Sequence, residues 1–525
     1  MERKKTLPLF MSFAMATSLA LAACSQQPSA TEPAPANGGN EGAAASGTTS
    51  EPKATEPKPE APTEITIMLP LNIAETPPDT IKNELEKLTN TKLTYQFFPA
   101  DTYEEKLNAT FATGGLPDVT YLKNQATFIQ FKEAIRDNQF WEIGPYLGEF
   151  ENLSKMKESV LNNTKVDGKL YSLYIGRPLA RQGLIYRKDW ADKLGLKAPE
   201  TTEDLFAMAK AFTEQDPDGN DANNTIGLAD RNDLIYGAFK TLSSFFGTPN
   251  NWGEKDGQLL PEFMFPEYIE TMDYMKRLRE AGYMNQDFAA TSKTDQVNLF
   301  QSGTAGLYIG SMQDVNSLYN NLVKNVPEAE VATHNRIVKP GGEFGIWAIP
   351  GYNNVVLFPK SSIKDEAELK KVLAFFDKMM TPEVANLMYW GIEGTHYTVV
   401  DGMAKVAEDS DMVQRDVKGY KDSVIGEPET NGMYAGYHEL QARIDAERFI
   451  IENEPHAIHD PTAPLDSATY TEIGQELQKI ITDATYQYMY GEIDAAGFQQ
   501  AVETWKSRGG QKIIDEYTAA YKANR

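Results

Sequence analysis

The stretch DPDGNDANNT, residues 216–225, places an oxygen-bearing side chain at nearly every second position. Loops that bind calcium supply oxygen ligands from positions one, three, five, seven and nine, the seventh through a backbone carbonyl. Counted from the first aspartate, these positions hold Asp216, Asp218, Asn220, Ala222 and Asn224. Hard oxygen donors suit Ca²⁺ far better than Zn²⁺. The sequence therefore predicts a structural Ca²⁺ site, with a polar turn between helix and strand as the alternative.

Two positions of this stretch depart from the EF-hand pattern. Asp221 stands where a glycine usually makes the sharp turn, although aspartate tolerates left-handed backbone angles. Gly227 stands at the last position, where an EF-hand has a bidentate glutamate. Because only Asp216 and Asp218 among the expected ligands carry a formal charge, we expect a modest affinity for calcium.

Recognisable catalytic motifs are missing from the sequence. It has no Gly-x-Ser-x-Gly elbow, no Walker loop and no His-Glu-x-x-His. His456, His459 and Asp460 are close in sequence and would suit zinc, but a polar loop is the simpler interpretation. With 75 acidic residues, some pair of carboxylates will lie close in any fold. Composition alone therefore leaves a glycosidase open.

Length and charge limit the possible classes of protein. A chain of 525 residues is too long for one hydrophobic core, so two or more domains are expected. The formal net charge of −25 argues against nucleic acid as a partner, because the phosphates would be repelled. A neutral ligand is compatible with this charge, whereas a polyanionic one needs a local basic patch.

The first 23 residues have the features of a secretory signal. A basic start is followed by an apolar run, residues 7–21, that is too short to span a bilayer comfortably. The run ends in Leu21-Ala22-Ala23-Cys24, which resembles the lipobox of bacterial lipoproteins, and Cys24 is the only cysteine of the chain. The resemblance implies lipidation of Cys24 with a diacylglyceryl group and a further chain such as palmitate, enough for stable anchoring. We expect a lipoprotein on the extracellular face of the cell membrane.

Residues 24–62 form a second region of distinct composition. After the cysteine they are rich in Ser, Pro, Ala, Thr, Gly and Glu and contain no aromatic residue. Such a segment cannot bury enough apolar surface to offset the entropy of ordering. We expect a disordered tether.

Alternating strand and helix patterns begin after the tether. Strands are expected at residues 64–69, 92–98 and 118–121, with helical patterns between them. Further strands are expected at 184–186, 225–229 and 305–309, and Thr201 with Asp204 forms a capping box before a helix. This alternation is typical of an α/β fold with a largely parallel sheet. From about residue 404 the chain is mostly helical in pattern.

Several short motifs together resemble one known family. They are Gly115-Leu116-Pro117-Asp118-Val119, Asp167-Gly168-Lys169-Leu170-Tyr171, Arg187-Lys188-Asp189-Trp190, Gly303-Thr304-Ala305-Gly306 and Gly391-Ile392-Glu393-Gly394-Thr395-His396-Tyr397. With the lipobox and the Asp216 stretch, their order and spacing resemble the lipoprotein solute-binding subunits of bacterial ABC importers. The similarity is to the large branch from Gram-positive bacteria that includes receptors for complex oligosaccharides.

The resemblance implies a two-lobed periplasmic-binding-protein-like α/β fold of type II. Its lobes are joined by a multi-segment hinge and close on the ligand. We expect residues 63–177 plus 350–394 in the first lobe, and residues 178–349 plus 395–525, with C-terminal helices, in the second. Receptors of this kind also close the calcium loop with an oxygen residue where Thr225 stands, which adds Thr225 to the expected metal ligands.

Ligand-binding residues are expected where strands end at the hinge. In α/β sheets ligands sit beyond the carboxyl ends of strands, and sugars are bound by aromatic faces flanked by planar hydrogen-bonding groups. The candidates are Lys123, Asn124, Gln125, Tyr174, Arg177, Arg231, Asn232, Ser311, Met312, Trp347 and Tyr352. The resemblance supports the loop of Ser311 and Met312, because such receptors often line the cleft floor with it.

The expected function is a membrane-anchored, extracellular binding protein that delivers a solute, chiefly an oligosaccharide, to the permease of an ABC transporter. We expect no enzymatic activity, no nucleic-acid partner and a monomer. Neutral plant-type oligosaccharides come first among the expected ligands and uronate-containing glycans second, while peptides and other small solutes stay open. A secreted, tethered carbohydrate-active hydrolase is the alternative.

Overall fold

The computed structural model describes residues 61–523. The signal segment, the lipidation residue Cys24 and nearly all of the expected tether lie outside the described residues. Within the described part of the chain, no helix is both long and apolar enough to cross a membrane.

The first large sheet has five strands in the order β2-β1-β3-β12-β4. They are β1 (Thr63–Leu71), β2 (Thr91–Pro99), β3 (Val119–Leu122), β4 (Ser172–Gly176) and β12 (Tyr352–Leu357). Strand β1 runs parallel to β2 and β3, whereas β12 runs antiparallel to β3 and β4. Strands β1, β2, β3 and β4 therefore run in one direction, so the largely parallel sheet expected from the sequence is confirmed, with β12 as its one antiparallel strand. Strand β12 is antiparallel because it enters the sheet from the edge at which β3 and β4 end.

The second large sheet has four strands in the order β10-β5-β9-β6. They are β5 (Gln182–Arg187), β6 (Ile226–Ala229), β9 (Ala305–Ser311) and β10 (Val331–His334). Only β6 and β9 are parallel, while β5 is antiparallel to both β9 and β10. Three two-stranded pairs complete the strands of the described residues: β7 (Trp252–Lys255) with β8 (Gln258–Pro261), β11 (Ile346–Trp347) with β15 (Ala457–Ile458), and β13 (Tyr397–Val400) with β14 (Met403–Val406).

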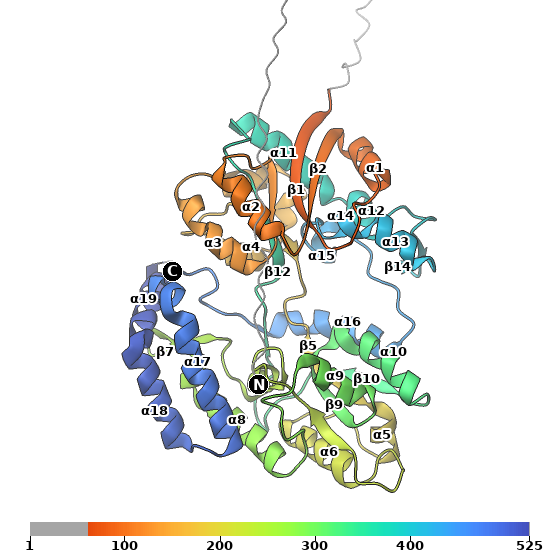
Figure 1. Cartoon of the computed structure of the whole chain (residues 1–525), viewed down its shortest axis with the longest axis vertical. Helices are drawn as coiled ribbons and strands as arrows, with labels where there is room; N and C mark the ends of the chain where they lie inside the picture. The colour runs from red at the N-terminus through yellow and green to blue at the C-terminus, as the bar shows by residue number, and fades with distance from the viewer. Residues whose placement is uncertain (1–60, 524–525) are drawn as a thin grey trace, which may run out of the picture. The chain divides into compact units, whose positions relative to one another are not determined.

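Helices cover each sheet, as Figure 1 shows. Around the first sheet are α1 (Thr80–Thr89), α2 (Tyr103–Ala112), α3 (Gln125–Arg136), α4 (Glu158–Asn163), α11 (Glu366–Met379), α12 (Pro382–Trp390), α13 (Ser410–Asp416), α14 (Lys418–Lys421) and α15 (Pro428–Asn431). Around the second are α5 (Lys188–Lys193), α6 (Thr202–Glu214), α7 (Ala238–Phe246), α9 (Lys293–Gln301), α10 (Val315–Asn325) and α16 (Gln441–Asn453). Short helical turns are η1 (Gly144–Glu149), η2 (Leu153–Lys155), η3 (Glu262–Met264), η4 (Met312–Asp314), η5 (Glu454–His456) and η6 (Lys506–Gly510).

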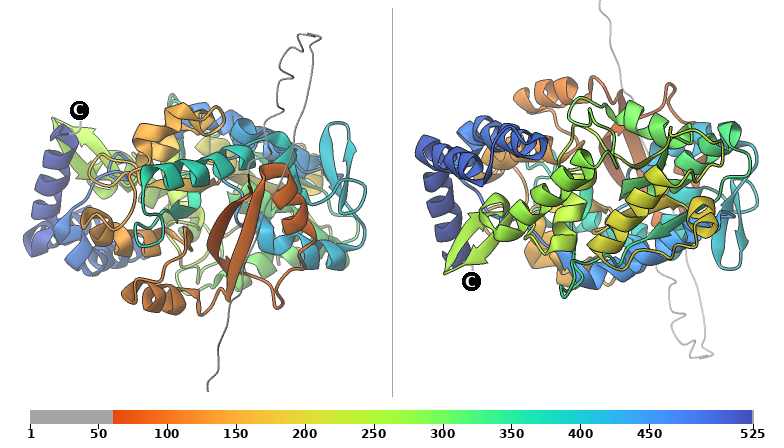
Figure 2. Two further views of the ribbon diagram at one scale, coloured as in Figure 1. Left: turned by 90° about the horizontal axis from the view of Figure 1, so that it is seen from above. Right: turned by 90° about the horizontal axis from the view of Figure 1, so that it is seen from below.

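The C-terminal helices form a bundle with an earlier helix. Helix α17 (Ala468–Tyr490) packs against α8 (Pro266–Glu280) and against α18 (Ala495–Trp505), and α19 (Gln511–Ala523) contacts β8. The blue C-terminal helices accordingly lie beside green helices in the right-hand view of Figure 2. The helix-rich C-terminal part expected from the sequence is confirmed.

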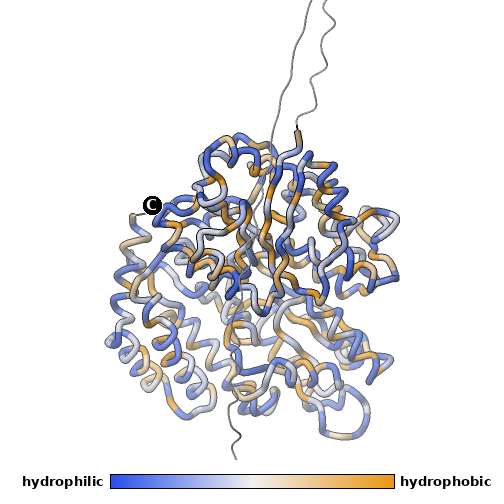
Figure 3. The backbone as a smooth tube through the Cα atoms, turned by 45° about the horizontal axis from the view of Figure 1, so that its top comes forward, coloured by the Kyte–Doolittle hydropathy of each residue, from blue (hydrophilic) through white to orange (hydrophobic). Residues whose placement is uncertain are grey.

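Local sequence patterns explain how β1 and α6 form. Strand β1 carries a long apolar run, orange in Figure 3, and its last five residues are all buried, as expected for a strand covered on both faces. Helix α6 begins as the sequence predicts: Asp204 N donates to Thr201 Oγ1 over 3.1 Å, and Thr201 N donates back to Asp204 Oδ2 over 2.9 Å.

The segment between Tyr397 and Gly432 contacts the first sheet and its helices. Tyr121 Oη donates to the carbonyl of Ser423 over 2.9 Å, and Tyr420 Oη donates to the carbonyl of Pro78 over 3.1 Å. The sequence-based division assigned residues 395–525 to the second lobe. These contacts favour a boundary after Tyr437 instead, because Tyr420 and Ser423 are buried against the first sheet and Tyr434 is still bonded to Asn386 and Trp390 of α12. We propose that revised boundary.

Candidate functional site

Strand register brings the expected ligand loops to one edge of each sheet. In the first sheet, Tyr352 at the start of β12 pairs with Gly176 at the end of β4. In the second sheet, Gln182 at the start of β5 pairs with Ser311 at the end of β9, and β6 runs parallel to β9. The carboxyl ends of β3, β4, β6 and β9 therefore lie where the chain passes between the sheets. We call residues 177–181 and 346–351 the crossing segments.

Backbone hydrogen bonds join the two crossing segments to each other. Arg177 N donates to the carbonyl of Gly351, and Ile349 N donates to the carbonyl of Leu179, each over 2.9 Å. A third passage of the chain lies alongside, since Ala348 N donates to the carbonyl of Ile458 over 3.0 Å. These passages form a multi-segment connection between the sheets.

Two buried asparagines fasten these passages to the second sheet and its helices. Asn250 Nδ2 donates to the carbonyls of Ala348 and Ile458 over 2.8 and 2.9 Å. Asn453 Nδ2 donates to the carbonyls of Ala180 and Gln182 over 2.8 and 3.2 Å. Sequence reasoning missed both asparagines, because nothing in the surrounding pattern distinguishes a buried asparagine from a surface one.

Two arginines lie on the first crossing segment. Arg177 is exposed and Arg181 is half-buried. Arg177 is within electrostatic range of both Arg181 and Tyr236, and partial desolvation by the surrounding protein, followed by repulsion from Arg181, lowers the pKa of Arg177. Sequence reasoning identified Arg177 but missed Arg181, although the second arginine stands on the same expected crossing.

An aromatic pair lies beside these arginines. The rings of Tyr236 and Trp347 have centroids 5.8 Å apart, and Tyr236 is 47% exposed. Trp347 is buried and donates its Nε1 hydrogen to Thr241 Oγ1 over 3.0 Å. Trp347 therefore supports Tyr236, which presents the accessible aromatic surface that a sugar ring needs.

The loop after β6 fixes the position of Tyr236. Asp233 Oδ1 accepts from Ile235 N and Tyr236 N over 3.0 and 2.9 Å. The buried Arg231 pairs with Asp233 at 3.2 Å and donates to the carbonyl of Tyr236. Arg231 thus positions the loop and has little guanidinium surface left for a ligand, while its neighbour Asn232 is exposed.

Ser311 and Met312 differ in what they can offer a ligand. Met312 is completely buried and its sulfur lies over Gly183, so it is a core residue. Ser311 is half-buried, and its hydroxyl has no hydrogen-bond partner among residues 61–523. Of these two candidates, only Ser311 has a free polar group.

Two tyrosines expected at the site are core residues. Tyr174 is completely buried, accepts from Lys157 N over 2.9 Å and donates to Glu427 Oε1 over 3.2 Å. Tyr352 is 6% exposed and packs edge-on against Phe128. The predictions for Tyr174 and Tyr352 are corrected accordingly, because β4 and β12 are covered on both faces and leave these rings in the core.

Two of the three side chains expected to bind ligand in the loop after β3 already form hydrogen bonds within the protein. Lys123 Nζ donates to the carbonyl of Ala100 over 2.7 Å. Asn124 is the N-cap of α3, accepting from Thr127 N and donating to Glu104 Oε1, each over 2.9 Å. Gln125 is half-buried at the start of the helix. The N-cap role of Asn124 is a sufficient reason for an asparagine at this position, whether or not it also contacts a ligand.

The Asp216 loop gathers oxygen atoms on a tight backbone. Asp216 and Asp221 both have positive φ angles, 46° and 58°, so aspartate does adopt the left-handed turn expected at position 221. Asn220 N donates to Asp216 Oδ1 over 3.1 Å, and Asn220 Nδ2 donates to Asp218 Oδ2 over 2.7 Å. Asn224 Oδ1 accepts from Asn220 Nδ2 over 3.3 Å. Four of the expected ligand side chains thus lie together.

The carboxylates of this loop are electrostatically coupled. Partial desolvation and then the hydrogen bond with Asp216 raise the pKa of Asp218, whereas hydrogen bonds to Asp218 and to loop amides lower that of Asp216. Two carboxylates close enough to share a proton, with amide oxygens beside them, form a donor set that fits Ca²⁺. Among residues 61–523 no group of three or more His, Cys, Asp and Glu side chains that could hold a metal is found, so calcium would depend on amide and carbonyl oxygens as well.

Thr225 does not join this group through its side chain. It is buried, and Thr225 Oγ1 donates to the carbonyl of Phe212 in α6 over 2.8 Å. The expectation of a Thr225 hydroxyl ligand is corrected: the hydroxyl ties the end of the loop to the helix. Ala222 could contribute only its backbone carbonyl.

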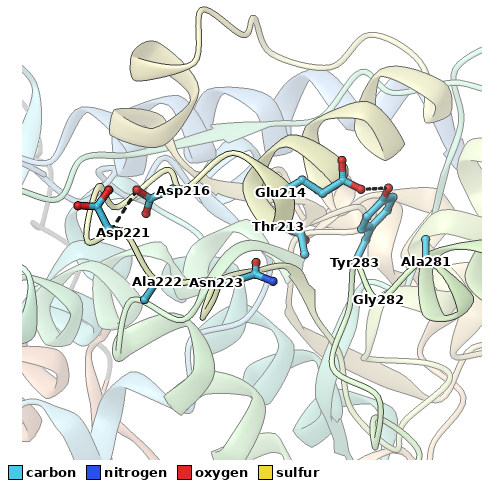
Figure 4. A pocket seen from close by; sticks show the side chains of 9 residues that line it. All are labelled: Thr213, Glu214, Asp216, Asp221, Ala222, Asn223, Ala281, Gly282 and Tyr283. Carbon is cyan, nitrogen blue, oxygen red and sulfur yellow. Dashed lines mark hydrogen bonds between the residues drawn. The ribbon is translucent and has the colours of Figure 1, made fainter.

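A pocket of about 630 Å³ adjoins this loop, as Figure 4 shows. It is lined by Thr213, Glu214, Asp216, Asp221, Ala222, Asn223, Ala281, Gly282 and Tyr283. Its one aromatic hydroxyl, that of Tyr283, donates to Glu214 Oε1 over 2.6 Å. None of these residues belongs to the crossing segments, so the pocket is not the predicted ligand site.

Comparison with known proteins places this geometry in context. The family model described as bacterial extracellular solute-binding protein matches residues 73–386. The polygalacturonan/rhamnogalacturonan-binding protein YtcQ of Bacillus subtilis is 43% identical over 474 residues, which cover 88% of this chain and 92% of the relative. The lipoprotein LipO of Bacillus subtilis is 32% identical over 472 residues, with 88% and 93% of the two chains covered.

Solved structures show the same fold at lower identity. An HMO-binding, ABC-transporter-associated solute-binding protein from Bifidobacterium longum infantis matches with a TM-score of 0.67 at 19% identity, covering 88% of this chain and 99% of that chain. An EF-hand mutant of FusA from Streptococcus pneumoniae, in complex with fructo-nystose, matches with a TM-score of 0.59 at 18% identity, covering 88% and 100%. The two-lobed α/β fold of solute-binding proteins is therefore confirmed.

Proposed function

The chain belongs to the bacterial extracellular solute-binding proteins, and from this we propose that it binds an oligosaccharide at the crossing segments and delivers it unchanged to an ABC transporter permease. The observation that carries the proposal is the strand-end edge of both sheets. There an exposed aromatic ring, Tyr236, is within electrostatic range of Arg177, which is also in range of Arg181, and Arg181 directly precedes Gln182, the strand partner of Ser311. Aromatic faces and planar donors are what pyranose rings require.

The ligand class we propose is an acidic oligosaccharide of the pectin type. Support comes from YtcQ, a polygalacturonan/rhamnogalacturonan-binding protein that is 43% identical over 88% of this chain. The net charge of −25 would repel such a ligand unless positive charge is gathered locally. Uronate-containing glycans thus move ahead of the neutral oligosaccharides that the sequence alone put first.

Binding must favour one arrangement of the two lobes to signal to a permease. A ligand shifts a conformational equilibrium only by its difference in affinity for the two states, and moving a population from 1:99 to 99:1 takes about 5.5 kcal/mol. Stacking on Tyr236 and a few desolvated hydrogen bonds from both crossing segments supply energies of this order.

Thermal-shift and titration experiments with a glycan panel test this function. We expect oligogalacturonides of three or more residues to raise the melting temperature and to bind with micromolar or tighter affinity. A protein that shows no stabilisation by any plant oligosaccharide, or that releases reducing ends during the titration as a hydrolase does, would overturn the proposal.

Anchoring through Cys24 is a separate proposal. It rests on Leu21-Ala22-Ala23-Cys24 directly after a secretory signal pattern and on the 32% identity to the lipoprotein LipO. Metabolic labelling with an alkyne fatty acid is expected to tag the wild type at the extracellular membrane face. Cys24→Ala should lose the label; retention of the label would refute the assignment. As a binding protein of this kind we expect a monomer.

Calcium in the Asp216 loop is also proposed. The residues that would hold it are Asp216, Asp218, Asn220, Ala222 through its carbonyl, and Asn224. A structural neighbour, FusA, has an EF-hand that was the object of mutation. Bound calcium would supply a fixed positive charge that holds the end of α6 to the start of β6; it would have no part in ligand chemistry.

A further inference from the structure

Arg177 and Arg181 have no acidic partner among residues 61–523; Arg279 and Arg336 have none either, but their guanidinium groups lie over the rings of Tyr490 and Phe344. The chain carries 75 acidic against 50 basic residues. The buried arginines elsewhere are paired: Arg187 with Asp189 at 2.6 Å and Arg231 with Asp233 at 3.2 Å. Neither Arg177 nor Arg181 forms a side-chain hydrogen bond or ion pair with any of residues 61–523.

The lack of a partner is most evident for Arg181. Its Nε is buried and has no hydrogen-bond partner among the described residues. A buried donor left without an acceptor costs free energy, and a second positive charge close by adds to that cost. Because Arg177 lies within electrostatic range of Arg181, the pair is a local positive site in an acidic protein.

Local geometry holds the pair at the strand-end edge. Arg177 N is bonded to the carbonyl of Gly351, and the carbonyl of Arg181 accepts from Met312 N over 3.0 Å. Ser311, whose hydroxyl has no partner in the described part of the chain, precedes Met312 and pairs with Gln182 in the sheet. Backbone on both sides is therefore fixed, while Arg181 Nε and Ser311 Oγ are buried and have no hydrogen-bond partner among residues 61–523.

We propose that Arg177 and Arg181 form a carboxylate subsite that recognises a uronate group of the bound oligosaccharide. This inference rests on the proposed function and adds to it the residues that bind the negatively charged carboxylate of the ligand. A guanidinium offers paired N–H donors that match a carboxylate, and two of them can bind one carboxylate from two sides. Tyr236, within electrostatic range of Arg177, places an aromatic face next to the same sugar unit.

The subsite also explains discrimination by charge. A neutral sugar or a methyl-esterified uronate would leave the two guanidinium groups without an anion, so they would repel each other as they do in the free protein. A free uronate removes that repulsion. The acidic form of a ligand is therefore bound more tightly than its ester, although the rings and hydroxyl groups are the same.

Isothermal titration of the full chain in detergent tests the subsite, with trigalacturonate and its fully methyl-esterified form as probes. For the wild type we expect tighter binding of trigalacturonate. Arg181→Gln and Arg177→Gln should each weaken trigalacturonate about 10- to 100-fold, the range for loss of charge-assisted hydrogen bonds. Binding of the ester should change less than about threefold, and Arg181→Lys should restore part of the loss, because the charge stays while the paired geometry goes.

The matched control is Arg508→Gln, since Arg508 is exposed and 3.8 Å from Glu476 on a C-terminal helix; it should alter neither probe. Equal effects of Arg181→Gln and Arg177→Gln on both probes, or no effect on either, would overturn the subsite. A wild type that binds neutral oligosaccharides and ignores trigalacturonate would overturn the subsite but leave the proposed function intact. Binding of no glycan at all would overturn both.

Discussion

At the scale of single residues, the buried carboxyl of Glu427 governs a pH response. Glu427 accepts from Tyr174 and lies 3.9 Å from Lys157, which also pairs with Glu454 at 2.7 Å and Glu429 at 3.7 Å. Burial, only partly offset by Lys157, raises the pKa of Glu427 to about 7. Tyr174, expected at the ligand site, serves this buried cluster instead.

The direction of the pH effect follows from linkage. The unfolded carboxyl titrates at about 4.3, so the folded state holds the proton more tightly between that pH and 7. The contribution of protonated Glu427 to stability is complete below the unfolded pKa and is lost as pH rises through about 7. Glu427→Gln should therefore flatten the fall of melting temperature between about pH 4.5 and 7.5, the interval bounded by the unfolded and folded pKa values. Glu158→Gln, at an exposed position outside this cluster, is the control; an unchanged slope in Glu427→Gln would contradict the assignment.

Tyr236 is the second residue-scale test. Its exposed ring is supported by Trp347 and held by Arg231 and Asp233, so little of the fold depends on the ring itself. Tyr236→Ala should weaken oligosaccharide binding about 10-fold or more, in line with one stacked ring worth about 1–2 kcal/mol, and should shift the melting temperature little. Tyr470→Ala, at an equally exposed tyrosine of α17, should leave titration curves unchanged. Full affinity in Tyr236→Ala would remove this ring from the site.

At the scale of elements, the Asp216 loop links α6 to β6. Asp216 and Asp218 repel each other unless a proton or a cation lies between them. Chelation of calcium is expected to lower the melting temperature by several degrees, and Asp218→Ala should abolish that sensitivity. Differential scanning calorimetry with and without chelator checks both expectations. The control is Asp256→Ala, at a β7–β8 turn. Identical melting curves for the wild type with and without chelator would reject the calcium site.

The crossing segments depend on buried amides as well as on strands. Asn453 is completely buried, donates to the carbonyls of Ala180 in the first crossing segment and Gln182 in β5, and accepts from Asn335 Nδ2 over 2.8 Å. Asn453→Ala leaves these groups unsatisfied, so the free energy of unfolding should fall by about 2–4 kcal/mol in denaturant titrations. The exposed Asn325→Ala should cost less than about 0.5 kcal/mol. A loss as small for Asn453→Ala would show that the crossings are held by other contacts.

Local sequence signals predicted elements better than they predicted side-chain roles. The capping box at Thr201 and the strands β1, β2, β5, β6 and β9 were predicted because they follow from neighbouring residues. Whether a tyrosine at a strand end faces ligand or core depends on alternation relative to partners far along the chain. Tyr174 forms a hydrogen bond with Glu427, which is 253 positions away in the sequence, and no local sequence pattern predicts that contact.

At the scale of the whole molecule, the strand order of the second sheet brings the proposed ligand-binding residues to one edge. Arg181, Tyr236 and Ser311 come from three separate parts of the sequence and lie at the same sheet edge because β5, β6 and β9 are neighbours in one sheet. A sequence reading could name each loop as a strand end, yet it could not tell that Arg231 is consumed in holding Tyr236 or that Arg181 lacks a partner. Both observations depend on contacts between residues that are far apart in the sequence, so they require the folded structure.

The central claim is that the protein captures an acidic oligosaccharide at the crossing segments and releases it chemically intact. Native mass spectrometry of the protein after prolonged incubation with trigalacturonate tests it most directly. We expect one added mass equal to the whole trisaccharide, and the same trisaccharide recovered after heat denaturation. Shortened sugars in the recovered fraction, or a protein mass without any bound ligand, would contradict the account.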